Sequence, residues 1–435
     1  MMLLGTQRVN ERGELEVGGC STVALAQRFG TPLYVMDEAH MRSVCRQYRE
    51  TFGAKYPGDV DIVYAGKAFL TLAMCKLVQS EGLCLDVSTG GELHTGLVAG
   101  FPPERMYLHG NNKSDDEIRR ALEVGVRRVV VDSLAEMDQI ERLAEGRRVP
   151  VLLRVTPGIK AKTHEYIQTA QLDVKFGLGI LSGQALAGAR KALASPSIDL
   201  KGFHCHIGSQ LFGLDSYRET IRVMFDFMSS VLEATGFAAG ELNMGGGLGI
   251  RYVSDDVAPG VAALASVIEE AVVTQAKRAG FPIPKLMVEP GRSIVGEAGL
   301  TLYTAGVVKE IPSIRTYVSV DGGMSDNPRP ALYQAEYEII VANKASLPRT
   351  ETVTIAGKHC ETDVLISDTP SQPIRPGDLI AVQSTGAYNY AMASNYNRVP
   401  RPAVVFVLDG AADIVVERES LDDMVAHDRI PDRLR

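Results

Sequence analysis

Eight short apolar runs alternate with longer stretches of helical periodicity between residues 61 and 293. This alternation constrains the fold more than any other feature, because each run is typical of a buried strand and each stretch of an amphipathic helix. Eight strand-then-helix units in about 240 residues match the usual size of a closed (β/α)8 barrel. A doubly wound open sheet is the alternative, but it usually needs fewer strands. In chain order, the runs are DIVYAGK, CLDVSTG, MYLHGN, VVVDS, VLLRVTP, GFHCHIGS, ELNMGGG and LMVEPGRS.

The pattern changes at about residue 300. Runs such as ETVTIAGKHC and DLIAVQSTGAY are rich in β-forming residues and are separated by Gly, Pro, Asp and Asn. No helical periodicity alternates with them, which predicts a second, mostly antiparallel β domain. The early runs ELEVGGC and TPLYVMD are expected to add strands to it. We therefore expect an N-terminal segment (1–36) that joins the β domain, a barrel (37–300), and a C-terminal β domain with a charged tail (301–435).

Charge and cysteine usage narrow the class of protein. The net charge is −8, from 45 basic and 53 acidic residues, and no basic block stands out. This balance disfavours nucleic acid and anionic membranes as partners. The start, MMLLGTQRVNERGE, has an apolar run that is too short for a signal peptide or a membrane span. Six scattered cysteines without a C-x-x-C motif fit a reducing compartment, so the sequence predicts a soluble cytoplasmic enzyme.

Chemically distinctive residues gather at the carboxyl ends of the predicted barrel strands, where enzymes of this fold carry their chemistry. One of them is Lys67, which ends the first run and is flanked by apolar residues in VYAGKAF. Burying an unpaired ammonium is costly, so this lysine either reaches a surface or has a partner. The others are Asp86, His109-Gly110-Asn111, His206, Gly245-Gly246-Gly247 and Glu289-Pro290-Gly291-Arg292.

The seventh and eighth runs end in residues that suit an anion and a cationic ring. The glycines 245–247 allow backbone N–H groups to converge on an anion, and phosphate sites in such barrels often follow strands seven and eight. A flexible turn is the alternative. Glu289 needs a partner at a buried strand end. It either pairs with Arg292 for structural reasons or holds a heteroaromatic nitrogen protonated.

The sixth run contains His204 and His206, whose side chains share a face because side chains alternate along a strand. A metal site of the amidohydrolase kind would need further ligands, but only His359 and His427 follow, both outside the barrel. We therefore expect no metal, a core position for His204, and stacking of His206 on an aromatic ring. One cofactor fits all four features: a lysine, an anion cradle, a stacking ring and an acidic strand end. It is pyridoxal 5′-phosphate, bound covalently through Lys67.

Several long motifs then point to a known family. In order, and between about residues 30 and 410, the motifs are VYAGKAF, HGNNKS, HCHIGSQ, MGGGLGI, EPGRSIV, VDGGMSDNPRPALY, HCETD and TGAYNYAMASNYN. Together they resemble the fold-type III, alanine-racemase-like decarboxylases, and among these the diaminopimelate decarboxylase branch. The resemblance implies decarboxylation of meso-2,6-diaminopimelate at its D-configured centre to L-lysine and carbon dioxide, the last step of lysine biosynthesis.

The resemblance also implies roles for residues. Lys67, His206, Glu289 and Cys360 would be catalytic, with Cys360 as the proton donor. Cys360 and Glu361 would enter the active site of a partner subunit, which implies a homodimer with shared sites. The cofactor would be held by Lys67, Asp86, His206, Ser209, Gly245, Gly246, Gly247, Glu289, Pro290, Gly291, Arg292 and Tyr388. The substrate would be held by Arg292, Arg329, Tyr333, Glu361 and Tyr388, because an arginine suits a distal carboxylate and an acid suits a distal ammonium.

Two departures and four alternatives accompany this interpretation. The chain has Cys-Glu-Thr-Asp where the family motif resembles CESGD, one residue longer, and Ala170 where glycine is common. A racemase would usually place an arginine against the ring nitrogen, and Glu289 argues against it. A metal-dependent hydrolase lacks ligands, and a non-catalytic cofactor carrier would need only the barrel. A decarboxylase of ornithine, arginine or another diamino acid is disfavoured by Arg329 with Tyr333.

Overall fold

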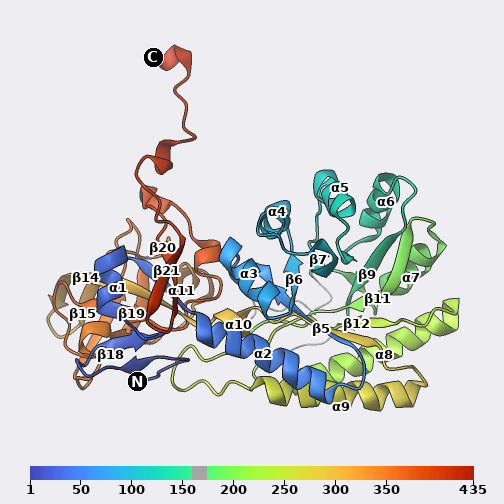
Figure 1. The fold of residues 1–435 in the computed structure, drawn as a ribbon, viewed down its shortest axis with the longest axis horizontal. Helices are drawn as coiled ribbons and strands as arrows, with labels where there is room; N and C mark the ends of the chain where they lie inside the picture. The colour runs from blue at the N-terminus through green and yellow to red at the C-terminus, as the bar shows by residue number, and fades with distance from the viewer. Residues whose placement is uncertain (159–173) are drawn as a thin grey trace. The chain divides into compact units, whose positions relative to one another are not determined.

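The computed structural model describes residues 1–158 and 174–435 (Figure 1), so Ala170 lies outside the described residues. Two compact units are present. The first comprises residues 42–250 and 257–293, and the second comprises residues 1–41, 251–256 and 294–435. The described residues contain no helix with both the length and the apolar character needed to cross a bilayer.

The first unit is a closed parallel barrel, as predicted, and each of the eight apolar runs forms one strand (Figure 1). All neighbouring strands are parallel, and the pairing of β8 with β9 closes the ring. A short strand β10 (Leu178–Gly179) adds to β9 on the side. The barrel strands are β5 (Val60–Ala65), β6 (Cys84–Val87), β7 (Met106–Leu108), β8 (Arg128–Val131), β9 (Val149–Thr156), β11 (Ile198–His204), β12 (Glu241–Asn243) and β13 (Lys285–Val288).

Helices follow the strands, and short polar residues fix where several of them begin. Thr71, Thr89, Ser114 and Ser133 each cap the helix that follows, by accepting a backbone N–H three residues further on. These caps hold the loops at the carboxyl ends of the strands. The helices are α2 (Glu38–Lys55), α3 (Leu72–Ser80), α4 (Gly90–Val98), α5 (Asp115–Val124), α6 (Leu134–Leu143), α7 (Gln184–Ala194), α8 (Asp215–Thr235), α9 (Val261–Ala279) and α10 (Arg292–Val295).

The barrel interior is a packed core rather than a pore. Buried side chains from six strands fill it, so the strand ends above it form a rigid floor. The residues are Val63, Cys84, Tyr107, Val130, Leu152 and Met287.

The second unit is mostly antiparallel, as predicted, and is built around β14 (Gly299–Ile311). β14 pairs antiparallel with β15 (Arg315–Val320), β19 (Leu379–Val382) and β4 (Leu33–Asp37). The predicted N-terminal contribution is confirmed, because β4 is the run TPLYVMD and lies between β14 and β20. The run ELEVGGC also adds strands to this unit, in a separate three-stranded sheet that packs on the same core.

The remaining elements of this unit complete both sheets. Two pairs, β4–β20 and β15–β17, are parallel, and the other pairs are antiparallel. The elements are β1 (Arg8–Val9), β2 (Leu15–Val17), β3 (Cys20–Ser21), α1 (Thr22–Phe29), α11 (Arg329–Tyr333), β16 (Ile339–Val341), β17 (Glu351–Ala356), β18 (Val364–Ser371), β20 (Ala403–Leu408) and β21 (Ala411–Val416).

Candidate active site

Lys67 lies directly after β5, in the single turn η1 (Gly66–Ala68). Its side chain is exposed while Gly66, Ala68 and Phe69 are buried, so of the two alternatives for Lys67 the structure shows the one in which it reaches a surface. The turn that ends the strand directs Lys67 outward and keeps the flanking apolar residues inside. Burial lowers the pKa of His206 well below its ordinary value, and the ammonium of Lys67 lowers it further. Lys67 and His206 therefore interact electrostatically at this end of the barrel.

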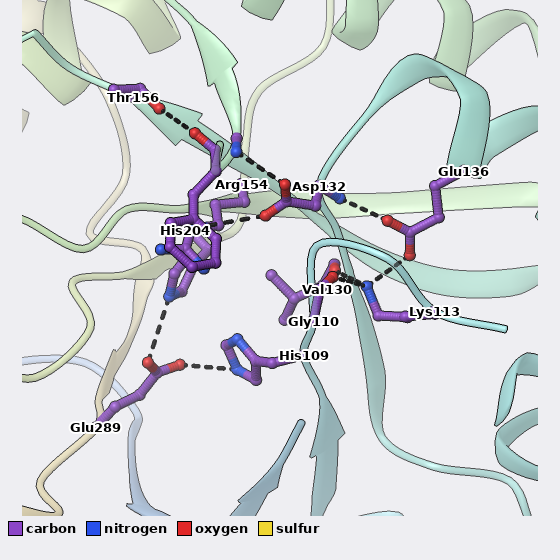
Figure 2. Close-up of polar contacts among 12 residues, drawn as sticks. His109, Gly110, Lys113, Val130, Asp132, Glu136, Arg154, Thr156, His204 and Glu289 are labelled. Atoms are coloured by element: carbon purple, nitrogen blue, oxygen red, sulfur yellow. Dashed lines mark hydrogen bonds and ion pairs between the residues drawn. The ribbon is translucent and has the colours of Figure 1, made fainter. Parts of the chain in front are cut away.

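Glu289 follows β13 and is the centre of a buried polar cluster (Figure 2). Its Oε1 accepts a hydrogen bond from Asn243 Nδ2 at 2.7 Å and lies 3.0 Å from His109 Nε2. Its Oε2 lies 3.3 Å from His204 Nε2. Burial opposes ionisation, but the two imidazoles outweigh it and hold the pKa of Glu289 well below its ordinary value. The predicted alternative of a Glu289–Arg292 pair is not present among the described residues.

His109 links Glu289 to Asp86, since its Nε2 is also 3.8 Å from Asp86 Oδ1. Burial disfavours a charged imidazole, but Asp86 and Glu289 together raise the pKa of His109. Asp86 is itself buried, which raises its pKa. Its Oδ1 accepts no hydrogen bond within the described part of the chain. The sequence placed His109 at a strand end but gave it no role, and it missed Asn243 at the end of β12.

His204 differs from His109 in the direction of its pKa shift. Burial lowers the pKa of His204 to about 4, so this imidazole is neutral near pH 7. Its ring packs edge-on against His109, with ring centroids 5.1 Å apart. The core position expected for His204 is therefore what the structure shows, although its neighbour Glu289 makes it part of the polar cluster.

Around this cluster, Lys113 ties together the turn after β7, the strand β8 and the first turn of α6 (Figure 2). Its Nζ donates to Gly110 O at 2.7 Å, to Val130 O at 2.7 Å and to Glu136 Oε1 at 2.6 Å. All three donors of the buried ammonium are satisfied, which is the condition for a stable buried ion pair. The turn that carries His109 is thereby fixed.

A second link runs from Glu136 to the end of β9 (Figure 2). Glu136 Oε2 accepts from Asp132 N at 2.8 Å, and Asp132 Oδ1 lies 3.8 Å from Arg154 Nε. The guanidinium of Arg154 lies over the ring of Phe176, 4.3 Å from its centroid. These contacts join the ends of β8 and β9 to the same rigid group of loops.

The glycine run after β12 is a fixed turn, not a flexible one. A Cβ on Gly245 would lie 2.7 Å from His206 Nδ1, one on Gly246 would lie 2.1 Å from Glu289 O, and one on Gly247 would lie 2.5 Å from Gly208 O. Only glycine allows the three loops to approach this closely. Gly246 N donates to His206 Nδ1 at 3.3 Å, which keeps that nitrogen unprotonated.

The remaining predicted residues of the barrel lie around this turn. Arg292 Nη2 donates to Ser209 Oγ at 3.0 Å, which joins the loops after β13 and β11. Pro290 O accepts from Ala65 N at 3.0 Å, and a Cβ on Gly291 would lie 2.9 Å from Ala65 Cβ. The loop after β13 is therefore held against the end of the strand that carries Lys67.

In the second unit, Arg329 lies in a cage of tyrosines. It is only 8% exposed, so it is not a solvated loop charge. Its Nε donates to Tyr337 Oη at 2.9 Å, and its guanidinium carbon lies 5.4–5.7 Å from the ring centroids of Tyr252, Tyr333 and Tyr388. Within the described residues, Arg329 has no acidic partner. Tyr333 and Tyr388 were predicted, whereas Tyr252 and Tyr337 were missed.

Cys360 and Glu361 lie in the turn between β17 and β18, and both are exposed. The other five cysteines are buried. Burial raises the pKa of Cys45, Cys75 and Cys205 to about 12 and that of Cys84 to about 11. Such thiols are inert, so Cys360 is the cysteine suited to chemistry.

The structure thus brings the predicted residues together in three groups. Within the first unit, the cofactor set gathers at the carboxyl ends of the barrel strands: Lys67, Asp86, His206, Ser209, Gly245, Gly246, Gly247, Glu289, Pro290, Gly291 and Arg292. Within the second unit, Arg329, Tyr333 and Tyr388 form the tyrosine cage, and Cys360 with Glu361 forms a separate exposed turn.

Comparisons with known proteins identify the family. Residues 38–296 match the family model described as pyridoxal-dependent decarboxylase, pyridoxal binding domain. A diaminopimelate decarboxylase from Bacillus subtilis is 48% identical over 434 residues, with 98% of each chain covered. One from Synechocystis is 44% identical over 440 residues, covering 99% of this chain and 93% of the relative.

Solved structures give the same result. A crystal structure of diaminopimelate decarboxylase from M. jannaschii in complex with L-lysine is similar, with a TM-score of 0.93 and 34% sequence identity over 99% of each chain. The likeness spans both units.

Proposed function

The chain belongs to the pyridoxal-dependent decarboxylase family, and we propose that it converts meso-2,6-diaminopimelate to L-lysine and carbon dioxide, the last step of lysine biosynthesis. The main observation in favour of this substrate is Arg329, a buried guanidinium without an acidic partner in residues 1–158 and 174–435. Such a guanidinium can bind a carboxylate group of the substrate. Diaminopimelate has one at its far end, whereas ornithine and lysine do not.

The barrel residues fit pyridoxal 5′-phosphate, the cofactor of this family. Lys67 presents a primary amine to the aldehyde, and Ser209 with the glycines 245–247 offers a cradle that any Cβ would fill. The uncharged ring of His206 suits stacking on the cofactor. Glu289 is held ionised by His109 and His204, so its carboxylate can pair with a protonated ring nitrogen of the cofactor. The bound cofactor supplies an electron sink for the bond to the departing carboxylate.

The other residues orient the substrate and handle the proton. Arg329 with Tyr333 would bind the distal carboxylate, and Glu361 the distal ammonium. Arg292 would also bind the substrate, and Tyr388 would reach both the cofactor and the substrate. After carbon dioxide leaves, Cys360 Sγ would deliver a proton to the carbon that carried the carboxylate, as a general acid.

We further propose a homodimer with shared active sites, working in the cytoplasm. Cys360 and Glu361 are exposed on the second unit, so a second copy can receive them. Mixing Lys67→Ala and Cys360→Ala chains should then restore part of the activity, because one hybrid site has both wild-type residues. No recovery would refute shared sites. Six unpaired cysteines are consistent with a reducing compartment.

A substrate panel tests the function directly. Carbon dioxide should evolve from meso-diaminopimelate and not from ornithine, arginine or L-lysine, and borohydride should fix the cofactor on Lys67. Strong activity on ornithine would refute the proposed substrate. A racemase is disfavoured, because the residue after β13 is an acid rather than an arginine.

A further inference from the structure

The exposed turn that carries Cys360 and Glu361 is held on its inner side by Asp363. The Asp363 carboxylate accepts hydrogen bonds from His359 N at 3.1 Å, from His359 Nδ1 at 2.7 Å and from Met324 N at 2.7 Å. Asp363 has φ +41, a left-handed conformation, within the shortened Cys-Glu-Thr-Asp motif. These contacts fix the base of the turn but touch neither the thiol of Cys360 nor the carboxylate of Glu361.

A second segment, η6 (Tyr396–Arg398), holds the outer side of the same turn. Asn397 Oδ1 accepts from Cys360 N at 3.0 Å, and Tyr396 Oη donates to Glu361 Oε1 at 2.5 Å. The ring of Tyr396 also stacks on His359, with ring centroids 5.8 Å apart and planes 16° apart. Tyr396 and Asn397 thus make three separate contacts, one with each residue from His359 to Glu361.

We propose that Tyr396 and Asn397 are positioning residues for the decarboxylation, Asn397 for the thiol of Cys360 and Tyr396 for the carboxylate of Glu361. This inference rests on the roles proposed above for Cys360 and Glu361. Asn397 fixes the backbone from which the thiol extends, and so the face from which the proton arrives. Tyr396 orients one carboxylate oxygen and leaves lone pairs for the ammonium of the substrate.

The backbone of η6 explains why an asparagine stands at this position. Asn397 has φ +51, a conformation that glycine and asparagine adopt at low cost. Arg398 then pairs with Asp428 Oδ2 at 2.7 Å, which anchors the segment from its other end. The segment that carries Asn397 therefore has a contact outside the turn as well as those to the turn.

The two residues predict different kinetic defects in the full-length enzyme. Asn397→Gly keeps the left-handed backbone but removes the acceptor, and kcat should fall about 10- to 100-fold with little change in KM, because proton delivery is impaired. Tyr396→Phe keeps the ring on His359 but removes the hydroxyl. KM for meso-diaminopimelate should rise about 3- to 10-fold, the value of one hydrogen bond, with kcat unchanged.

A stereochemical measurement separates positioning from folding. In D2O the reacting carbon of the product gains one deuterium, and wild-type enzyme should place it in a single configuration. Asn397→Gly should give a mixture, because solvent then delivers part of the protons from the other face. Asn397→Asp keeps an acceptor oxygen and should restore both kcat and the single configuration. Loss of folded protein alone would not change this ratio.

Controls distinguish failure of the inference from failure of the proposed function. Asn395 directly precedes η6, but its side chain contacts Val399 and Glu419 and not the turn, so Asn395→Ala should leave all three measurements unchanged. If Cys360→Ala is inactive while Asn397→Gly matches wild type in kcat and deuterium configuration, the inference is refuted. If Cys360→Ala keeps wild-type activity, the proposed role of Cys360 fails first.

Discussion

Replacing Arg329 with methionine should abolish the preference for a substrate with a distal carboxylate. The guanidinium has five N–H donors, and Nε is engaged by Tyr337, so the Nη groups remain for the substrate. A bidentate contact would make two charge-assisted hydrogen bonds, each worth about 1.5–3 kcal/mol. The pair is then worth about 3–6 kcal/mol, which corresponds to about 10²- to 10⁴-fold in kcat/KM.

The assay compares meso-diaminopimelate with D-lysine, which has the same reacting centre but lacks the distal carboxylate. Wild-type enzyme should prefer meso-diaminopimelate by the factor given above. Arg329→Met should reduce this preference to less than about tenfold, because the distal contact no longer contributes. Folding should survive, because the change removes a buried charge that has no acidic partner among the described residues.

A matched control is Arg315→Met, because Arg315 is a partly exposed arginine of the same unit that pairs with Asp368 at 2.7 Å. It should keep the wild-type preference. If Arg329→Met also keeps the preference while remaining folded, then Arg329 does not bind the distal carboxylate, and the argument for the substrate fails.

Three further predictions concern the barrel. Lys113→Met should destabilise the protein by about 3–5 kcal/mol in urea unfolding, because Glu136 is left buried and uncompensated, and Lys113→Met with Glu136→Leu should recover most of this. The deficit of the single variant should shrink as the pH falls, because burial raises the pKa of Glu136 and the carboxyl then takes up a proton in the folded state. Gly246→Ala should weaken cofactor binding in an absorbance titration, since its Cβ would lie 2.1 Å from Glu289 O. His109→Gln should move the acid limb of the kcat/KM profile to higher pH, because His109 lowers the pKa of Glu289 and the ionised form is required; an unchanged limb would refute the link.

The barrel could be predicted because its strands are buried on both faces and appear in the sequence as continuous apolar runs. The strand ends then indicated Lys67, His206 and Glu289, because all carboxyl ends of a parallel barrel meet at one face. The sequence could not show that Lys67 is exposed. Its apolar neighbours face inward only because η1 turns the chain directly after β5.

Contacts between distant residues account for what the sequence missed. His109 meets Glu289 across 180 positions, and no local pattern records that meeting. Tyr252 reaches Arg329 from a segment that lies between two barrel stretches in the chain but belongs to the second unit. A tyrosine outside a recognised motif gives no signal of such a role.

The place of β4 has a consequence for how the chain matures on the ribosome. β4 is made early, yet its two sheet neighbours, β14 and β20, are made more than 250 positions later. The barrel unit has all its strands once residue 293 has emerged, and it can fold while synthesis continues. β4 therefore stays unpaired until β14 has been translated, and its second neighbour, β20, follows only near the end of the chain. An apolar strand that waits in this way is open to pairing with other chains.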